Sequence, residues 1–173
     1  MLNATQIEKL LEASGQYPAI KIRILLALGT GLGRGDIDTL KISDIDFESN
    51  FIATTSRKTK KSMGSRPVSA EVMLELSKYV CILDVDQEKL FNTKFNHRTW
   101  HKVCEKAGLA DLKFHDLRKT FCSLLAQNGI STAVTQGLLE HSSLNLTNKV
   151  YTNVDPVLRH AVEQLPVNRW LQE

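Results

Sequence analysis

Two histidines, an arginine and a tyrosine in the C-terminal half of the chain could act together on a phosphodiester. His115 and Arg118 are three residues apart at the start of a predicted helix, so their side chains project from one face. His141 follows the end of a later predicted helix, and Tyr151 lies in a segment that we expect to be a loop. Arginine presents a planar pair of donors to phosphate oxygens, histidine transfers protons, and tyrosine can be a covalent nucleophile. The set predicts phosphoryl-transfer chemistry, although spacing alone also fits a solvated helix face and an aromatic residue at the edge of the core.

A basic segment without acidic residues lies between two stretches that are suited to β-strands. Residues 51–55 are rich in β-branched and aromatic side chains, and residues 66–68 are placed to return as a paired strand. The cations of this segment are Arg57, Lys58, Lys60, Lys61 and Arg66. We predict a small hairpin or three-stranded sheet over about residues 43–68, with a basic tip that suits an anionic partner.

Two other patterns suggest different chemistry, and neither is favoured. The glycine-rich turn at residues 29–35 lacks the third glycine of Gly-x-Gly-x-x-Gly, and it follows a helix where a phosphate-binding loop would follow a strand. His97 and His101 are four residues apart and could bind a metal from one helix face. No glutamate of a His-Glu-x-x-His motif lies between them and further ligands are not evident, so a solvated helix face is the preferred interpretation.

The framework that must position these residues is mostly helical. A nearly all-apolar helix begins at Pro18 and leads into the glycine-rich turn, and a helix that is apolar all round is a central core helix. Apolar periodicity predicts further helices around residues 7–11, 37–40, 72–80, 96–107, 114–125, 134–139 and 158–165. We therefore predict a mainly α fold with a small antiparallel β-sheet (α+β).

Composition limits the class of protein to an ordinary globular domain. The chain has 173 residues, of which 42% are hydrophobic and 24% charged, and its formal net charge is +3. This weak basic excess permits a polyanionic partner without requiring one. Cys81, Cys104 and Cys122 form no CxxC pair, which argues against a zinc site or a disulfide framework and for a reducing compartment. Because no signal sequence is evident and no apolar run could span a bilayer, we expect a cytoplasmic protein.

Five motifs, in order along nearly the whole chain, resemble the catalytic domain of the tyrosine recombinase (phage integrase) family. The turn at residues 30–37 resembles the segment that carries the family's first arginine, and residues 40–46 resemble its usual sequel. Residues 57–61 resemble the β-hairpin lysine motif. Residues 114–121 (FHDLRKTF) are very similar to the His-x-x-Arg box, residues 138–143 (LLEHSS) to the second histidine motif, and residues 150–152 (VYT) to the nucleophile motif.

The resemblance implies how these residues would break and rejoin DNA. Tyr151 would attack the scissile phosphate, giving a 3′-phosphotyrosyl link and a free 5′-hydroxyl. Arg34 and Arg118 would hold the non-bridging oxygens and stabilise the charge that builds up on them. Lys58 would protonate the leaving 5′-oxygen, with Lys60, on the same strand face, as the alternative.

The remaining roles that the resemblance implies concern proton transfer and DNA contacts. His115 would take or return the tyrosine proton, and His141 would hydrogen-bond the phosphate. No metal or other cofactor would be needed, because the covalent link conserves the energy for rejoining. The expected contacts to double-stranded DNA come from Arg57, Lys60, Lys61, Arg66, Arg98, Lys102 and Lys119.

Two departures from the family pattern leave alternatives open. The family's first arginine directly follows Thr-Gly-Leu, where this chain has Gly33, and Arg34 comes one place later. Glycines at positions 31, 33 and 35 would let the turn rewind so that Arg34 reaches the same phosphate. Glu140 stands where the family usually has glycine, and it is unfavourable beside a phosphate unless it points away or pairs with a cation. A catalytically impaired DNA-binding remnant of an integrase is therefore the alternative, and a type IB topoisomerase, for which the chain is short, is a third.

The resemblance also implies how the protein is organised. Family members usually carry an N-terminal DNA-clamping domain, and we expect residues 1–173 to be a single catalytic domain without it. On DNA we expect a homo-oligomer, a tetramer, with a monomer open for the free domain, near the nucleoid and away from membranes. The expected process is site-specific DNA recombination or integration by a mobile element. The amphipathic tail at about residues 155–173 would either dock on a neighbouring protomer or pack on its own domain.

Overall fold

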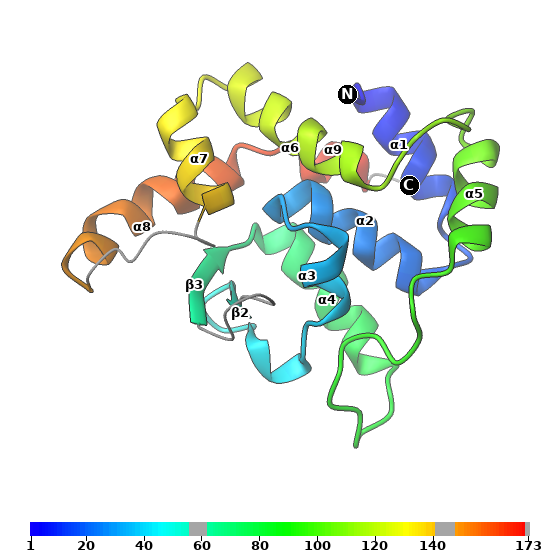
Figure 1. The fold of residues 1–173 in the computed structure, drawn as a ribbon, viewed down its shortest axis with the longest axis horizontal. Helices are drawn as coiled ribbons and strands as arrows, with labels where there is room; N and C mark the ends of the chain where they lie inside the picture. The colour runs from blue at the N-terminus through cyan, green and yellow to red at the C-terminus, as the bar shows by residue number, and fades with distance from the viewer. Residues whose placement is uncertain (56–61, 141–147, 172–173) are drawn as a thin grey trace.

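The computed structural model describes residues 1–55, 62–140 and 148–171, without the side chains of residues 55, 62–64, 140 and 148–155. Its α-helices are α1 (Ala4–Ala13), α2 (Pro18–Thr30), α3 (Arg34–Asp38), α4 (Ala70–Cys81), α5 (His97–Lys106), α6 (His115–Gln127), α7 (Thr132–Glu140), α8 (Asn148–Glu163) and α9 (Val167–Trp170). A short 3-10 helix, η1 (Ile42–Asp44), leads into the strands β1 (Ile45–Asp46), β2 (Phe51–Thr55) and β3 (Ser62–Pro67). Figure 1 shows α2 crossing the middle of the domain, with the sheet and α7–α8 at one end and α1 and α5 at the other. The predicted α+β class is confirmed.

Helix α2 is the centre of the core. Pro18 occupies its first turn, where the missing N–H has no helical partner to lose. Every residue from Ile22 to Thr30 is buried, so the helix has no solvent face. Helices α4 and α6 both pack against it, as expected for a helix that is apolar all round.

The sheet is small and antiparallel, with the strand order β1-β2-β3. Ile45 pairs with Ile52, and Ile52 pairs with Arg66 across the next strand. Ile52 is fully buried, so this row of the sheet faces the core. The predicted sheet over about residues 43–68 is confirmed, and its basic tip at residues 56–61 lies outside the described residues.

Helix ends follow local sequence signals. Ser69 and Asn96 accept a hydrogen bond from the first turns of α4 and α5, respectively. Gly108 and Gly129 take positive φ shortly after α5 and α6, where a left-handed residue ends a helix cheaply. The capping box of α1 is formed by Asn3, which accepts from the backbone of Gln6, and by Gln6, whose side chain accepts from the backbone N–H of Asn3.

The C-terminal region is more helical than predicted. The segment around Tyr151, residues 149–153, is predicted to be a loop, with a helix only at about residues 158–165, but α8 runs from Asn148 through Pro156 to Glu163. Its buried stripe, which includes Leu158, Ala161 and Val162, packs toward α7 and β3. This packing outweighs one lost backbone hydrogen bond at the proline. The following α9 packs on α1 and α4, so the tail folds onto its own domain.

Gly31 occupies the closest contact between three helices. It ends α2 in the left-handed conformation, with φ 68°. A Cβ atom there would lie 2.6 Å from Cδ1 of Phe121 on α6 and 2.9 Å from Cδ2 of Leu139 on α7. Both the backbone angle and the packing therefore require glycine at this position.

We predict that Gly31→Ala lowers the free energy of unfolding by about 3 kcal/mol, because it combines left-handed strain with overpacking of the core. Gly129→Ala is the matched control: its φ is 75°, but no atom lies within 4 Å of the added methyl group. The control should lose about 1 kcal/mol, from strain alone. Urea denaturation followed by circular dichroism measures both, and equal losses would contradict the packing argument.

Candidate functional site

The turn between α2 and α3 determines the direction in which Arg34 leaves the backbone. Gly33 is the N-cap residue of α3, with φ −75° and ψ 158°, and Arg34 is the first residue of that helix. The rewinding expected of three glycines is confined to Gly31, since Gly33 has an extended backbone open to any residue and Gly35 is helical. A Cβ atom on Gly33 would meet only Asp36 Oδ2, at an ordinary 3.5 Å. Glycine is thus not required at position 33 by conformation or by space.

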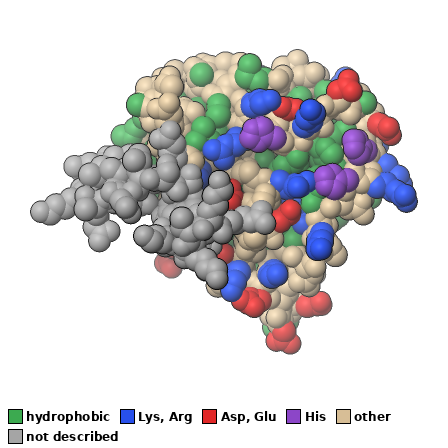
Figure 2. All heavy atoms as spheres, in the orientation of Figure 1, with side chains coloured by type: hydrophobic (Ala, Val, Ile, Leu, Met, Phe, Trp, Pro, Cys, Tyr) green, Lys and Arg blue, Asp and Glu red, His purple; other side chains and the backbone are tan. Residues whose placement is uncertain are grey.

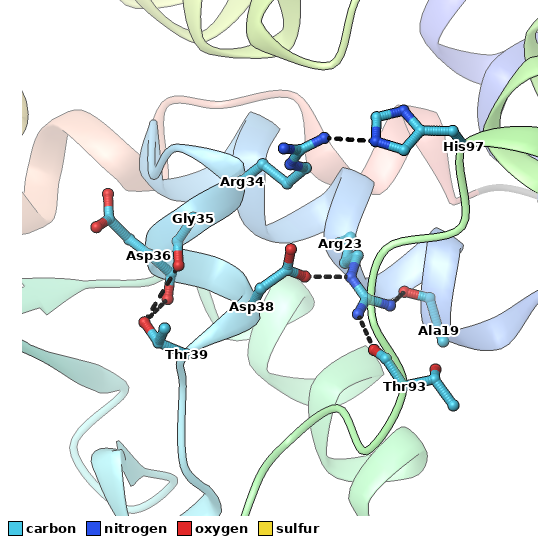
Figure 3. A network of polar contacts seen from close by, with 9 residues as sticks. All are labelled: Ala19, Arg23, Arg34, Gly35, Asp36, Asp38, Thr39, Thr93 and His97. Atoms are coloured by element: carbon cyan, nitrogen blue, oxygen red, sulfur yellow. Dashed lines mark hydrogen bonds and ion pairs between the residues drawn. The ribbon is translucent and has the colours of Figure 1, made fainter. Parts of the chain in front are cut away.

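The Arg34 side chain points toward α5 (Figure 3). Its Nη1 atom is 3.1 Å from Nε2 of His97, and its guanidinium carbon is 5.1 Å from the ring centroid of Phe95. The rings of Phe95 and His97 meet edge to face, 5.1 Å apart. Arg34 is therefore fixed by one hydrogen bond and one cation–π contact.

A pocket of about 460 Å³ opens beside Arg34. Its walls are the start of α3, the inner face of α5 and the segment that enters α6, and its lining residues are Arg34, Gly35, Phe95, His97, Trp100, His101, Leu112, Lys113, Phe114 and His115. The pocket thus brings together Arg34 and His115, two of the predicted site residues, and it adds His97, His101 and Lys113. Arg118 is not among the lining residues, so the structure does not place the two predicted arginines in one pocket.

Helix α6 divides its residues between the core and the site. Leu117 and Phe121 are fully buried, whereas His115 is exposed and Arg118 is half-buried. The three-residue spacing puts His115 and Arg118 on one side of the helix, as predicted. Arg118 also lies near Cys122, since its charge opposes the rise that burial causes in the pKa of that thiol.

The first turn of α6 contains one acidic residue, Asp116, which lies between His115 and Arg118 in the sequence. Its carboxylate is already bound by other groups. Asp116 binds the ammonium group of Lys119 at 2.8 Å and accepts the backbone N–H of Lys113. These contacts, the Lys119 hydrogen bond first, hold the pKa of Asp116 below its ordinary value. Lys119 is therefore partly neutralised, whereas the side chain of Lys113 keeps its charge at the pocket.

A second arginine, Arg23 on α2, holds the outer wall of the site in place (Figure 3). It is 1% exposed, and its Nε atom donates to Asp38 Oδ1 at 2.8 Å. Its other nitrogens donate to the carbonyl oxygens of Ala19 and Thr93. Because a buried charge must be paired and hydrogen-bonded, Arg23 ties α2, α3 and the segment before α5 into one arrangement.

Arg66 was predicted to contact DNA, and its placement does not fit that role. It is 2% exposed and points inward from β3. Its guanidinium donates to the carbonyl oxygens of Leu138 and Leu139 at the end of α7, and to that of Thr30 at the end of α2. Arg66 thus joins the hairpin to the segments that lead to Arg34 and to His141.

Helix α5 carries two other predicted DNA contacts at its surface. Arg98 and Lys102 are exposed, as a DNA contact requires. His97 and His101 are exposed too, and both line the pocket. Within residues 1–55, 62–140 and 148–171 no group of three or more histidine, cysteine or acidic residues is placed to hold a metal ion. None of the helices in these ranges is both long and apolar enough to cross a membrane.

The other predicted site residues lie wholly or partly outside the described residues. Arg57, Lys58, Lys60 and Lys61 belong to the segment 56–61, and His141 belongs to the segment 141–147. For Tyr151 the structure gives the backbone only, in the first turn of α8. Their predicted roles stay predictions.

Sequence reasoning missed the two walls of the pocket that face Arg34. His97 was considered as a metal ligand or a solvated residue, and Phe95 and Lys113 were not considered at all. A signal was present, since Phe95 and Asn96 directly precede the helix and Lys113 directly precedes the His-x-x-Arg box. Their convergence with Arg34 depends on how α3, α5 and α6 pack, which no local pattern reports.

Comparison with known proteins assigns the chain to a family. The model of the phage integrase family matches residues 1–157. The tyrosine recombinase XerA of Pyrococcus furiosus is 32% identical over 178 residues, which cover 94% of this chain and 60% of XerA. The chain therefore belongs to the phage integrase family, that is, to the tyrosine recombinases. It spans between 52% and 60% of the length of the first curated relatives that it matches.

Solved structures agree with this assignment. The catalytic domain of bacteriophage HP1 integrase superposes with a TM-score of 0.65 at 25% identity, over 99% of this chain and 98% of that domain. The XerH site-specific recombinase, solved bound to its difH substrate, gives a TM-score of 0.66 at 23% identity, over 88% of this chain and 49% of XerH. The fold is that of a tyrosine recombinase catalytic domain.

We predict that Arg66→Met lowers the free energy of unfolding by about 3 kcal/mol, because the carbonyl groups that it satisfies stay buried without their donor. Arg98→Met removes the same charge from an exposed site and should change stability by less than about 0.5 kcal/mol. Thermal and urea unfolding give both values. A loss for Arg66→Met no larger than that for Arg98→Met would show that the buried contacts do not stabilise the domain.

Proposed function

We propose that this domain cleaves and rejoins one strand of duplex DNA through a phosphotyrosyl intermediate. The single observation that carries the proposal is the family match over residues 1–157, which includes the nucleophile motif. Supporting it, the side chains of His115 and Arg118 lie together on α6, next to a basic pocket. The DNA-bound state of XerH supports duplex DNA as the partner. Assembly as a tetramer on DNA is part of the proposal.

In the proposed reaction the Tyr151 hydroxyl oxygen attacks phosphorus as the bond from phosphorus to the 5′-oxygen breaks. The tyrosine proton passes to a base, which we assign to His115, and the leaving 5′-oxygen takes a proton from Lys58. Arg118 stabilises the charge on the non-bridging oxygens, with a hydrogen bond from His141. Rejoining reverses each transfer, so no oxidant, metal or nucleotide enters the balance.

Arg34 does not take the place of the family's first arginine in this proposal. It points from α3 toward α5 and lines a pocket to which Arg118 does not contribute. The scissile phosphate would then have one arginine, Arg118, where the family has two. Gly33, at the family position, has an ordinary backbone with room for a side chain, so an arginine could be accommodated there.

We predict that Tyr151→Phe abolishes covalent capture of DNA. The chain is incubated with a library of duplexes that carry a nick beside randomised sequence, and covalent complexes are counted after denaturation. Tyr17→Phe is the matched control, since Tyr17 is half-buried next to α2 and distant in sequence from every family motif. Capture by Tyr151→Phe equal to capture by the control would reject the proposed function.

We predict that Gly33→Arg speeds covalent capture by about 100-fold, the range expected for one donor to transition-state charge. The reason is that a second guanidinium would reach the scissile phosphate from the family position. Gly33→Ala places the same restriction on the backbone but adds no charge. It should fold normally, and its rate of covalent capture should not rise. If folded Gly33→Arg captures DNA no faster than Gly33→Ala, position 33 is not the vacant arginine position.

A further inference from the structure

The pocket beside Arg34 has a one-sided charge. Arg34, His97, His101, Lys113 and His115 are all of its titratable lining residues, and none of the lining residues is acidic. They come from α3, from α5 and from the entry to α6, which together line the opening. Figure 2 shows histidine side chains gathered with lysine and arginine on this face of the domain. The charges of Arg34 and Lys113, with three histidines and no acidic residue in the lining, favour an anionic ligand.

Three carboxylates that lie near these walls in the sequence are directed elsewhere. Asp36 points away from Arg34, and Asp38 binds Arg23 (Figure 3). Asp116 binds Lys119 and the Lys113 backbone. The positive charge of the pocket therefore stays available to a ligand.

The floor of the pocket is aromatic and rigid. The rings of Phe95, Trp100 and Phe114 pack edge to face or tilted on one another, with centroids 5.3 to 6.0 Å apart. Trp100 and Phe114 are buried, and the indole N–H of Trp100 donates to the carbonyl of Leu112. An apolar floor lowers the local dielectric, which strengthens the attraction between the basic wall and an anion.

The bond between Arg34 and His97 fixes the donor without consuming it. Arginine has five N–H donors and no acceptor, so His97 Nε2 is the acceptor in this contact. Among the described residues His97 is the only hydrogen-bond acceptor of Arg34, and four N–H groups are left for a ligand. The guanidinium is held in advance, which reduces the entropy lost when a ligand binds.

We infer that this pocket binds a second phosphate of the DNA backbone, distinct from the phosphate that Tyr151 attacks. The inference rests on the proposed function for its choice of DNA as the ligand. The volume of about 460 Å³ is within the range of small-ligand sites, and an arginine with lysine and histidines is a common set for a phosphate. Arg118 lies outside the lining, so the pocket and the scissile phosphate use different arginines, and His115, which lines the pocket and is assigned the tyrosine proton, is the residue that the two sites share.

The dependence of DNA affinity on salt concentration reports the number of phosphate contacts, and it therefore tests the inference. Binding of a 20-base-pair duplex is measured at several salt concentrations with the Tyr151→Phe chain, which forms no covalent link. Arg34→Gln in this background should weaken binding about tenfold and reduce the slope of log affinity against log salt by about 0.9. Lys113→Gln, on the opposite wall, should act in the same direction and serves if Arg34→Gln fails to fold.

Arg169→Gln is the matched control, because it removes an equal charge from an exposed site on α9 that lines no part of this pocket. Its slope should equal that of the parent. If the slope is unchanged in both Arg34→Gln and Lys113→Gln, or falls equally in Arg169→Gln, the pocket holds no phosphate and the inference is overturned.

A neutral methylphosphonate identifies the phosphate itself. It is placed at one position at a time along a duplex recovered by covalent capture, and affinity is compared between Tyr151→Phe and its Arg34→Gln derivative. A methylphosphonate at one position should weaken DNA binding by the Tyr151→Phe protein and leave binding by its Arg34→Gln derivative unaffected. That position should not be the one that is joined to Tyr151. If no position affects the two proteins differently, or if the position that does so is the scissile one, the inference is overturned. Because the salt slope needs no cleavage, failure of the proposed function and failure of the pocket are distinguishable.

Discussion

The close approach at Gly31 is the constraint on which the rest of the site depends. The end of α2, the middle of α6 and the end of α7 meet where only a hydrogen atom fits, against Phe121 and Leu139. The residues after this point begin α3 and carry Arg34, while α6 carries His115 on its exposed side. The distance between the end of α2 and helix α6 therefore determines how far Arg34 and His115 lie from each other. A larger residue at position 31 would widen the pocket as well as loosen the core.

Two buried guanidinium groups hold segments of the chain in place in addition to apolar packing. Arg23 fixes the segment before α5, which has no strand or helix of its own to hold it, by donating to Thr93 and Asp38. Arg66 does the same at the end of α7 through the carbonyl groups of Leu138 and Leu139. A buried arginine left without acceptors is strongly unfavourable, so each group permits few alternative arrangements. Phe95 of the segment before α5 lines the pocket, so the buried Arg23, which is not among the lining residues, helps to decide its shape.

Local signals in the sequence were sufficient for most elements but not for the start of α8 or for the directions of side chains. Pro18 and Asn96 begin their helices as predicted, because the start of a helix depends on neighbouring residues only. Arg66 faces inward because the register pairs it with buried Ile52, and partners across a strand pair share a face. That register depends on the length and path of the hairpin, which residue types do not specify. The direction of Arg34 depends likewise on where α5 packs.

The distribution of charge explains how a chain with a net charge of only +3 can suit a polyanion. Screening at physiological salt limits electrostatic attraction to about 8 Å, so distant charges contribute little and local charges decide. Elsewhere on the surface some lysines are matched by acids, as in the pairs Lys41–Glu88 and Lys78–Glu75. The pocket around Arg34 has no such partner among its lining residues. An anion would therefore meet a stronger positive field there than over the matched regions, so the net charge alone does not describe the field at this face.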